Sequence, residues 1–282
     1  MAIKYRKIGW LIIIVLFSAC DQFEMRGFVA SYESADERFD QSEAWNDEHP
    51  FKNIVVQYDE YTIAVMADSH VGKTENLNVF IDEAIGINNA VAAVMVGDLT
   101  SGHADDYLKF NVQLPAQDVL MTFPVVGNHD LYFDGWKQFY DLFGTTTYWF
   151  SVTTPAASDL YICLDTGSGT LGSSQLAWLK DVLQNKRPHY RHCVLFTHNN
   201  LFRIRHTTTT NPNVEELRVL SNLTVQHKVD MVMTGHDHKK NLVKLGNTTH
   251  ITLDALKDGC SNAGFAELHV GDDYVECEFV NL

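Results

Sequence analysis

Short apolar runs in this sequence repeatedly end in side chains that can bind metal ions. One such run, 119–126, reads as a buried strand and is closed by Gly127. Asn128, His129 and Asp130 follow at once and place an amide, an imidazole and a carboxylate at the end of the predicted strand. The carboxyl ends of strands are where open α/β sheets build their sites. Taken alone, a polar turn that contains a histidine explains this stretch equally well.

Four further apolar runs show the same pattern, and together the five outweigh that alternative. The polar residues after these four runs are Asp68 and His70, then Asp98, then His198, and finally His236, Asp237 and His238. Asp68 and His70 alternate along the chain, so both can face one way. Imidazole and carboxylate are borderline-to-hard ligands that suit Zn, Mn and Fe. The sequence therefore predicts a metal site where five strands end.

The order of these motifs resembles that of the calcineurin-like metallophosphoesterase family. The motifs are Asp-x-His, Gly-Asp, Gly-Asn-His-Asp, His and Gly-His-x-His, and they extend over residues 61–238. The resemblance implies an α/β fold, a four-layer α/β/β/α sandwich of two mixed sheets, and an enzyme that hydrolyses phosphoesters. The Gly-x-Ser-x-Gly and Walker A motifs are absent from the sequence.

The resemblance also implies seven ligands for two divalent or trivalent transition-metal ions, Mn, Fe or Zn. Those of one ion would be Asp68, His70 and His238, and those of the other Asn128, His198 and His236. Asp98 would bridge the two ions, because a carboxylate has an oxygen for each metal. Two ions about 3.5–4 Å apart can share a hydroxide, lower its pKa and clamp the phosphoryl oxygens during in-line attack. Asp237 is expected to point away from the ions.

His129 is the catalytic candidate, because the histidine of this motif donates a proton to the leaving group in the family. Its neighbour Asn128 is an implied ligand, so the imidazole starts near the bound phosphate. A structural histidine in a turn is the alternative. Asp130 is expected to orient a backbone or side chain and not to act in catalysis. His103 and His206 lie in loops within reach of a substrate, although a solvated side chain is the simpler interpretation of each.

Two subfamilies fit the sequence poorly. Protein Ser/Thr phosphatases carry Gly-Asp-x-x-Asp-Arg-Gly, and residues 97–103 have neither that second Asp nor that Arg. Purple acid phosphatases place a Tyr ligand where Ser101 stands and lack the histidine that is His70 here. Because the Arg that binds a dianionic phosphate is missing, we expect a phosphodiester substrate. The alternatives are a phosphomonoesterase acting on a small phosphorylated metabolite and, less favoured, a non-catalytic binding protein on the same fold.

The first nineteen residues have the features of a lipoprotein signal peptide. Three basic residues precede an apolar core, 8–17, that is too short to span a membrane as a helix. The following Leu-Phe-Ser-Ala-Cys at 16–20 resembles a bacterial lipobox, and an ordinary cleaved signal is the alternative. We therefore expect Cys20 to be acylated. The enzyme would then be exported and anchored by lipid to a membrane of a bacterial envelope.

Loss of the signal changes the formal net charge from −15 to −18. Such an acidic protein repels nucleic-acid polymers, so we expect a small phosphoester as its substrate. Residues 20–52 are expected to form an acidic tether with a short helix that packs Phe39 and Trp45 onto the domain. A wholly disordered linker is the alternative. Residues 53–282 are expected to form the metallophosphoesterase domain.

Predicted strands and helices alternate along the domain. Helices are expected at 76–89, 134–143, 172–185 and 214–227, and a hairpin at 148–152 and 160–164. Four C-terminal strands, 242–245, 250–253, 264–270 and 274–280, are expected to form an antiparallel tail. This order of elements fits two sheets with helices outside.

Four cysteines follow Cys20. Cys163 and Cys193 lie in strand-like runs and are most simply buried small hydrophobic residues. Cys260 and Cys277 flank the penultimate strand, and the sequence leaves open whether they pair in an oxidising compartment.

Overall fold

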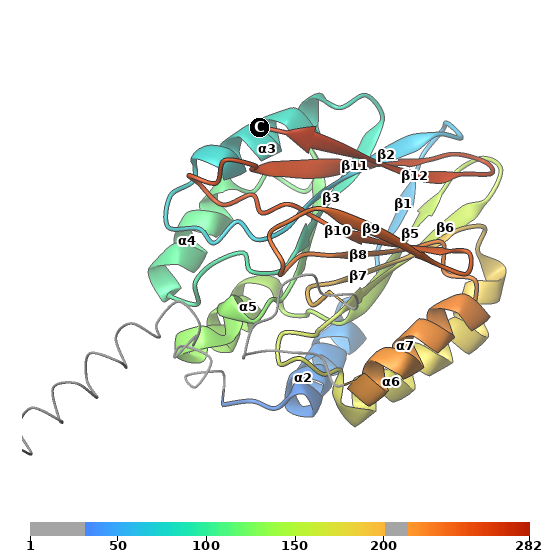
Figure 1. The fold of residues 1–282 in the computed structure, drawn as a ribbon, viewed down its shortest axis with the longest axis horizontal. Coiled ribbons are helices and arrows are strands. Elements are labelled where there is room, and N and C mark those ends of the chain that lie inside the picture. Colours follow the sequence, from blue (N-terminus) through green and yellow to red (C-terminus); the bar gives the residue numbers. More distant parts are fainter. Residues whose placement is uncertain (1–31, 201–213) are drawn as a thin grey trace, which may run out of the picture.

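A computed structural model describes residues 32–200 and 214–282 of the chain (Figure 1). The predicted signal peptide, Cys20 and His206 lie outside the described residues, so the expectations about them stay predictions. Within the described part of the chain, no helix combines the length and the apolar character that crossing a membrane requires.

Two β-sheets pack face to face at the centre of the molecule (Figure 1). The larger sheet contains, in spatial order, β1 (Asn53–Val55), β5 (Tyr148–Thr153), β6 (Ser158–Leu164), β7 (Cys193–Thr197), β8 (Met231–Thr234), β10 (Thr248–Thr252) and β9 (Asn241–Leu245). The smaller sheet contains β12 (Val275–Asn281), β11 (Gly264–Val270), β2 (Tyr61–Met66), β3 (Ala90–Val96) and β4 (Met121–Val125). Both sheets mix parallel and antiparallel pairs, as predicted.

Helices cover the outer face of each sheet. The smaller sheet is covered by α3 (Glu75–Gly86), α4 (Ala104–Gln113) and α5 (Gly135–Phe143), and the larger by α6 (Gly172–Asp181) and α7 (Val214–Gln226). Figure 1 shows α6 and α7 side by side, on the opposite side of the molecule from α3. Because β2 and β7 are covered on both faces, every residue in them is buried, and such strands read as continuous apolar runs. The predicted α/β/β/α sandwich is therefore confirmed.

Helix α2 (Ala35–Glu48) precedes the sandwich and packs firmly against it. Ser34 begins the helix with a capping box. The Arg38 side chain is fully buried, and its Nε donates to Asp165 Oδ2 over 2.7 Å. Phe39 packs edge-on against Trp178 of α6, with ring centroids 6.3 Å apart. Removing one partner of a buried ion pair typically lowers the free energy of unfolding by about 3–5 kcal/mol. The Arg38–Asp165 pair therefore holds the predicted short helix firmly on the sandwich.

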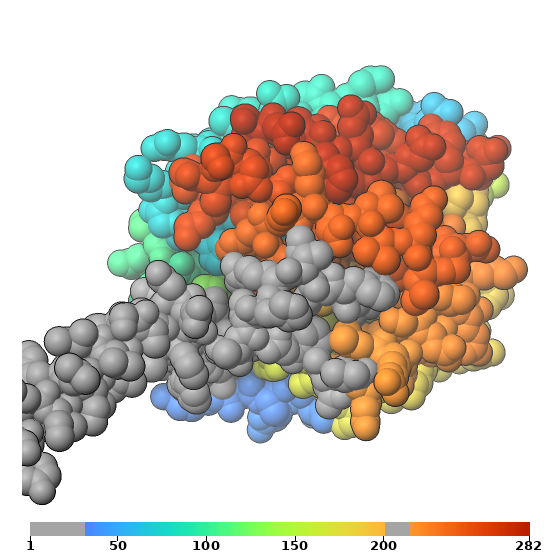
Figure 2. Space-filling view, in the orientation of Figure 1, coloured from blue at the N-terminus to red at the C-terminus, as the bar shows by residue number. Residues whose placement is uncertain are grey.

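The C-terminal strands do not form the single antiparallel tail that we predicted. β9 and β10 extend the larger sheet, whereas β11 and β12 extend the smaller one. β10 pairs antiparallel with β9 but parallel with β8. Side chains alternate between the two faces of a strand whether its neighbour runs parallel or antiparallel. The apolar pattern of β10 therefore did not reveal that it pairs parallel with β8. In the space-filling view these strands, orange to red, form much of the upper face (Figure 2).

One smaller expectation also changes, and one open question is answered. The predicted helix 172–185 is interrupted, because α6 continues into a π-helical turn, η3 (Val182–Lys186), and a 3-10 turn, η4 (Arg187–His189), that contains Pro188. Cys260 and Cys277 do not pair, and all four described cysteines are free thiols. Cys163 and Cys193 are fully buried, as expected.

Candidate metal centre

The predicted ligands lie on loops that follow strands of both sheets. Asp68 and His70 follow β2, Asp98 follows β3, Asn128 follows β4, His198 follows β7, and His236 and His238 follow β8. Strands β2, β3 and β4 run parallel to one another, and so do β7 and β8. The carboxyl ends of these strands meet at one edge of the sandwich, and the ligand-bearing loops meet there with them.

Four side chains form the first cluster: Asp68, His70, Asp98 and His238, whose ligand atoms all lie within 4.8 Å of one another. His238 Nε2 is 3.2 Å from Asp68 Oδ1, and His70 Nε2 is 3.6 Å from Asp98 Oδ2. The two Nε2 atoms of His70 and His238 are 3.1 Å apart, so both rings point at a common centre. These are the residues predicted for the first ion, together with the predicted bridge.

The second cluster comprises Asp98, His198 and His236 and again fits within 4.8 Å. His198 Nε2 is 3.3 Å from Asp98 Oδ2 and 3.3 Å from His236 Nδ1. The fourth residue predicted for this ion, Asn128, is buried beside His129, whose backbone N–H donates to Asp98 Oδ1. Asn128 Oδ1 is buried and accepts no hydrogen bond from any described residue. A buried carbonyl oxygen of this kind fits a metal ligand.

Asp98 is shared by the clusters through one oxygen. Its Oδ2 faces both His70 and His198, at 3.6 and 3.3 Å. Its Oδ1 instead accepts the backbone N–H of His129 at 2.8 Å. The hydrogen bond to the backbone holds the carboxylate with Oδ2 toward both clusters. That each ion takes its own oxygen of Asp98 stays a prediction.

The backbone is unusual at the same residues. Nine non-glycine residues in the described part of the chain have positive φ, and five of them are predicted ligands: Asp68, His70, Asp98, His236 and His238. Such conformations typically cost about 1–3 kcal/mol each and persist only where the surroundings enforce them. Here neighbouring loops bind each other, since the N–H of Asp68 donates to Gly97 O and that of His70 to Asp98 O. Strain concentrated on one set of side chains marks a functional site.

Glycines at two strand ends allow the loops to approach this closely. Gly97 has φ +76°, and a Cβ there would lie 2.5 Å from His198 Nδ1. A Cβ on Gly127 would collide with the backbone N of Asp98. Any side chain at either position would therefore push apart two of the elements that carry the predicted ligands.

Asp130 ties two of the loops together. Its Oδ2 accepts from the N–H groups of Leu99 and Gly127, at 3.1 and 2.8 Å. Its Oδ1 accepts from the N–H and the hydroxyl of Thr100, at 2.9 and 3.2 Å. Burial and the nearby Asp98 raise the pKa of Asp130 to about 7. The side chain orients backbone, as predicted for it.

The electrostatics of the centre favour a cation. Burial opposes the charge of Asp98, yet the imidazoles of His198 and His129 hold its pKa well below the usual range. Burial lowers the pKa of His70 to about 3, so this ring is neutral and offers a lone pair. Burial also opposes the charge of His198, but Asp98 and Asp68 raise its pKa to about 10. This negative centre therefore favours a cation, and a metal ion would compete with the proton on His198.

The His198 ring is held with Nε2 toward the centre. Its Nδ1–H donates to the Val96 carbonyl, 2.9 Å away, so Nε2 is the nitrogen that gains a lone pair when the ring loses its second proton. Asp237 accepts from the Asn200 amide at 3.1 Å and belongs to neither cluster, as expected. His103 stacks on Phe133, with ring centroids 4.2 Å apart.

His129 lies at the rim of the centre. Its Nε2 is 3.9 Å from Asp98 Oδ2, and its side chain is 19% exposed, whereas that of Asp98 is buried. The ring contacts those of His70 and Tyr132, each with centroids 4.6 Å apart. Tyr132 was not among the predicted site residues, because its position after the ligand motif carries no signal of its own in one sequence.

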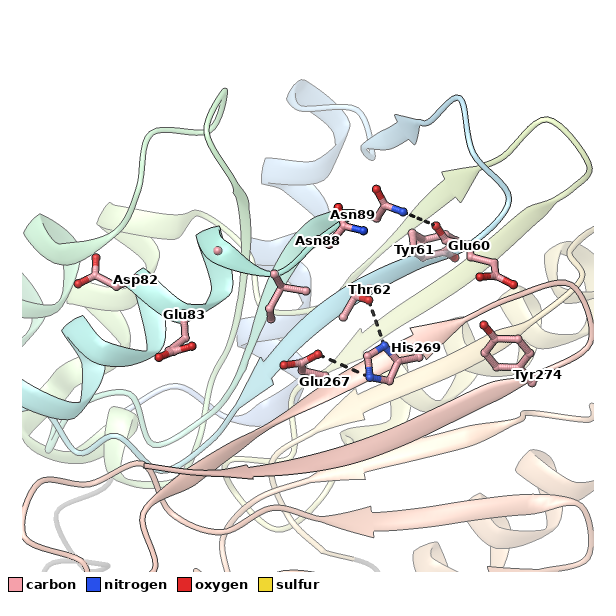
Figure 3. Close-up of a pocket in the computed structure, with 12 residues that line it drawn as sticks. Glu60, Tyr61, Thr62, Asp82, Glu83, Asn88, Asn89, Glu267, His269 and Tyr274 are labelled. Carbon is pink, nitrogen blue, oxygen red and sulfur yellow. Dashed lines mark hydrogen bonds and ion pairs between the residues drawn. The ribbon is translucent and has the colours of Figure 1, made fainter.

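A polar cavity of about 650 Å³ lies elsewhere (Figure 3). Glu60, Glu83 and Glu267 are among its lining residues, and His269 Nδ1 lies 3.1 Å from Thr62 Oγ1. The cavity adjoins the start of β2, whereas Asp68 follows the other end of that strand. It contains none of the predicted ligands and is separate from the candidate metal centre.

Solved structures share this fold. GAP50, described as the anchor in the inner membrane complex of Plasmodium, is 14% identical with a TM-score of 0.59, over 79% of this chain and 85% of that chain. A dimetal phosphatase from Danio rerio is 15% identical with a TM-score of 0.57, over 79% and 99%. The protein TT1561 of Thermus thermophilus is 14% identical with a TM-score of 0.53, over 78% and 98%. Identities this low establish the fold alone.

Sequence comparison assigns the family. Among curated proteins, none matches the chain. The model of the calcineurin-like phosphoesterase family matches residues 61–240, which is more than half of the chain and includes every predicted ligand. The chain therefore belongs to the calcineurin-like phosphoesterase family and is a phosphoester hydrolase.

Proposed function

We propose that this protein is a dinuclear metal-dependent phosphodiesterase. The observation that carries the proposal is the convergence of two largely buried clusters on one carboxylate, Asp98. A single ion would need only one of these clusters. The donor set of imidazole nitrogens, carboxylate oxygens and the Asn128 amide oxygen suits Mn, Fe or Zn. The likeness to a dimetal phosphatase from Danio rerio agrees with this assignment.

Two ions bound there would supply the Lewis acidity that polarises a phosphoryl group and lowers the pKa of water. The protein supplies the arrangement. Asp98 and Asp68 hold the negative charge, Val96 orients His198, and Asp130 fixes the spacing of the loops that carry Asp98 and Asn128.

We assign proton donation to His129. Its ring is at the rim of the centre and is partly exposed, so a leaving group can reach it from solvent. Its Nε2 lies 3.9 Å from Asp98 Oδ2, so the ring faces the centre in which the phosphoester would bind. The backbone N–H of His129 donates a hydrogen bond to Asp98 Oδ1, and this bond keeps the ring beside the centre.

A diester is the favoured substrate because it carries one negative charge at the reacting phosphate, whereas a monoester carries two at neutral pH. The loop 97–103, where protein phosphatases supply an Arg, contains neither Arg nor Lys. The chain also carries a formal charge of −15, which penalises a more anionic substrate.

The test compares bis(p-nitrophenyl) phosphate with p-nitrophenyl phosphate, using protein loaded with Mn²⁺. Because both release the same phenolate, the comparison isolates the charge at phosphorus. We expect kcat/KM to be higher for the diester. A higher value for the monoester identifies a phosphomonoesterase, and hydrolysis of neither ester points to a binding role on the same fold.

We also propose that the protein is exported and held at a membrane by lipid on Cys20. Three basic residues, an apolar core and the Leu-Phe-Ser-Ala-Cys run support this. We expect the wild-type protein to partition into detergent and Cys20→Ser to remain in the aqueous phase, because one diacylglycerol and one amide-linked chain exceed the marginal hold of a single acyl group. An aqueous wild-type protein contradicts the proposal.

A further inference from the structure

The structure assigns Tyr132 as a positioning residue that fixes the orientation of the Asn128 amide. An asparagine amide has two different ends, since Oδ1 accepts and Nδ2 carries two donors. Only Oδ1 can bind a cation. Asn128 Nδ2 donates to the Tyr132 hydroxyl over 3.2 Å, and the opposite atom, Oδ1, is buried with no hydrogen bond from any described residue. This inference rests on the proposed role of Asn128 as a ligand.

Tyr132 can reach the amide because of the backbone between them. The two residues are four apart, in and just before the 3-10 segment η2 (His129–Asp134). The helical path breaks at Tyr132 itself, which has extended dihedrals, and Phe133 and Asp134 follow with φ of 56° and 62°.

The surroundings hold Tyr132 in place. The residue is only 2% exposed, and its ring centroid is 4.6 Å from that of His129. Its carbonyl lies so close to Gly102 that a Cβ there would collide with it. Since both backbone and ring are fixed, the hydroxyl oxygen is fixed relative to Asn128.

Without the hydroxyl, the amide can rotate by half a turn. Either end would then face the cluster, and the end with two N–H donors repels a cation. In the metal-free protein the carboxylates of the centre attract the end with two N–H donors, so the competent orientation becomes the minor one. The apparent affinity for the second ion then falls by the fraction that is competent. Polar partners behind metal ligands typically contribute about 10–100-fold to metal affinity, and a neutral hydroxyl belongs near the lower limit.

The test is Mn²⁺ binding, measured by counting free Mn²⁺ with electron paramagnetic resonance during titration of metal-free protein. In Tyr132→Phe we expect the second ion to bind about 10-fold more weakly while the first binds as in wild type. The matched control is Tyr107→Phe, which removes a fully buried hydroxyl that donates to the Asp130 carbonyl at 2.8 Å. This control should bind both ions as wild type does. Unchanged affinities in Tyr132→Phe, or equal weakening of both ions, overturn the inference.

A second variant separates orientation from general damage. Asn128→Asp replaces the amide with a carboxylate whose two ends are alike, so there is no orientation to set. Adding Tyr132→Phe to Asn128→Asp should therefore not weaken the second ion further. A further 10-fold loss in that background contradicts the inference. If wild-type protein binds one ion only, the dinuclear centre itself fails, and that result is distinct from the failure of Tyr132 alone.

Discussion

Asp98→Asn is expected to abolish most of the hydrolysis and to weaken both metal ions together. Asp98 belongs to both clusters, and the substitution removes its negative charge from a buried position. Even partners behind a ligand typically contribute about 10–100-fold to metal affinity. A shared ligand should contribute more, so we expect at least about 100-fold weaker binding of each ion.

Asp159→Asn is the matched control for this loss. Asp159 is equally buried, but it accepts from the Tyr61 hydroxyl at 2.7 Å and pairs with Arg191 at 2.8 Å, away from the predicted ligands. That variant should unfold more readily and yet retain both ions. Metal content and turnover are measured on the folded fraction of each variant. Full occupancy of both sites in Asp98→Asn would exclude the bridging role.

His129→Ala is expected to act on the leaving group and not on metal binding. A general acid contributes typically about 10²–10⁴-fold where the leaving group needs a proton. An alkoxide such as ribose or glycerol needs that proton, whereas p-nitrophenolate leaves well without it. We therefore expect a loss of about 10²–10⁴-fold on an alkyl ester and less than about 10-fold on the nitrophenyl ester, with both metals retained.

His198→Ala provides the contrast. His198 lies within the second cluster, 3.3 Å from Asp98 Oδ2, so its loss should slow both esters and reduce metal content. If His129→Ala slows both esters equally while metals remain, His129 stabilises phosphoryl charge and donates no proton. Loss of metal from His129→Ala would instead show that its role is structural.

The strands and the ligand loops were predictable because burial leaves a strong pattern. β2, β3 and β7 are covered on both faces and read as continuous apolar runs, so the polar residues that end them stand out. The resemblance then grouped the ligands, and the structure brings six of the seven into the two shared clusters in the same grouping. The seventh, Asn128, lies beside them.

The direction of neighbouring strands and the contacts of individual side-chain atoms were not predictable from the sequence. The alternation of residues in β10 is the same for parallel and antiparallel neighbours, so the pairing with β8 was missed. Which oxygen of Asp98 faces the clusters depends on a backbone N–H from another loop. The burial of Arg38 depends on Asp165, which is 127 residues away in the chain. The contact of Tyr132 with Asn128 depends on the short 3-10 turn between them, which no propensity predicts.

The central claim is that the two clusters that share Asp98 bind one metal ion each and that catalysis needs both ions. The most direct measurement titrates metal-free protein with Mn²⁺ and records bound metal and diesterase rate on the same samples. We predict two ions per chain at saturation, with little hydrolysis after the first equivalent and most of it appearing with the second. Full activity at one ion per chain, or activity that survives removal of all metal, would contradict this claim.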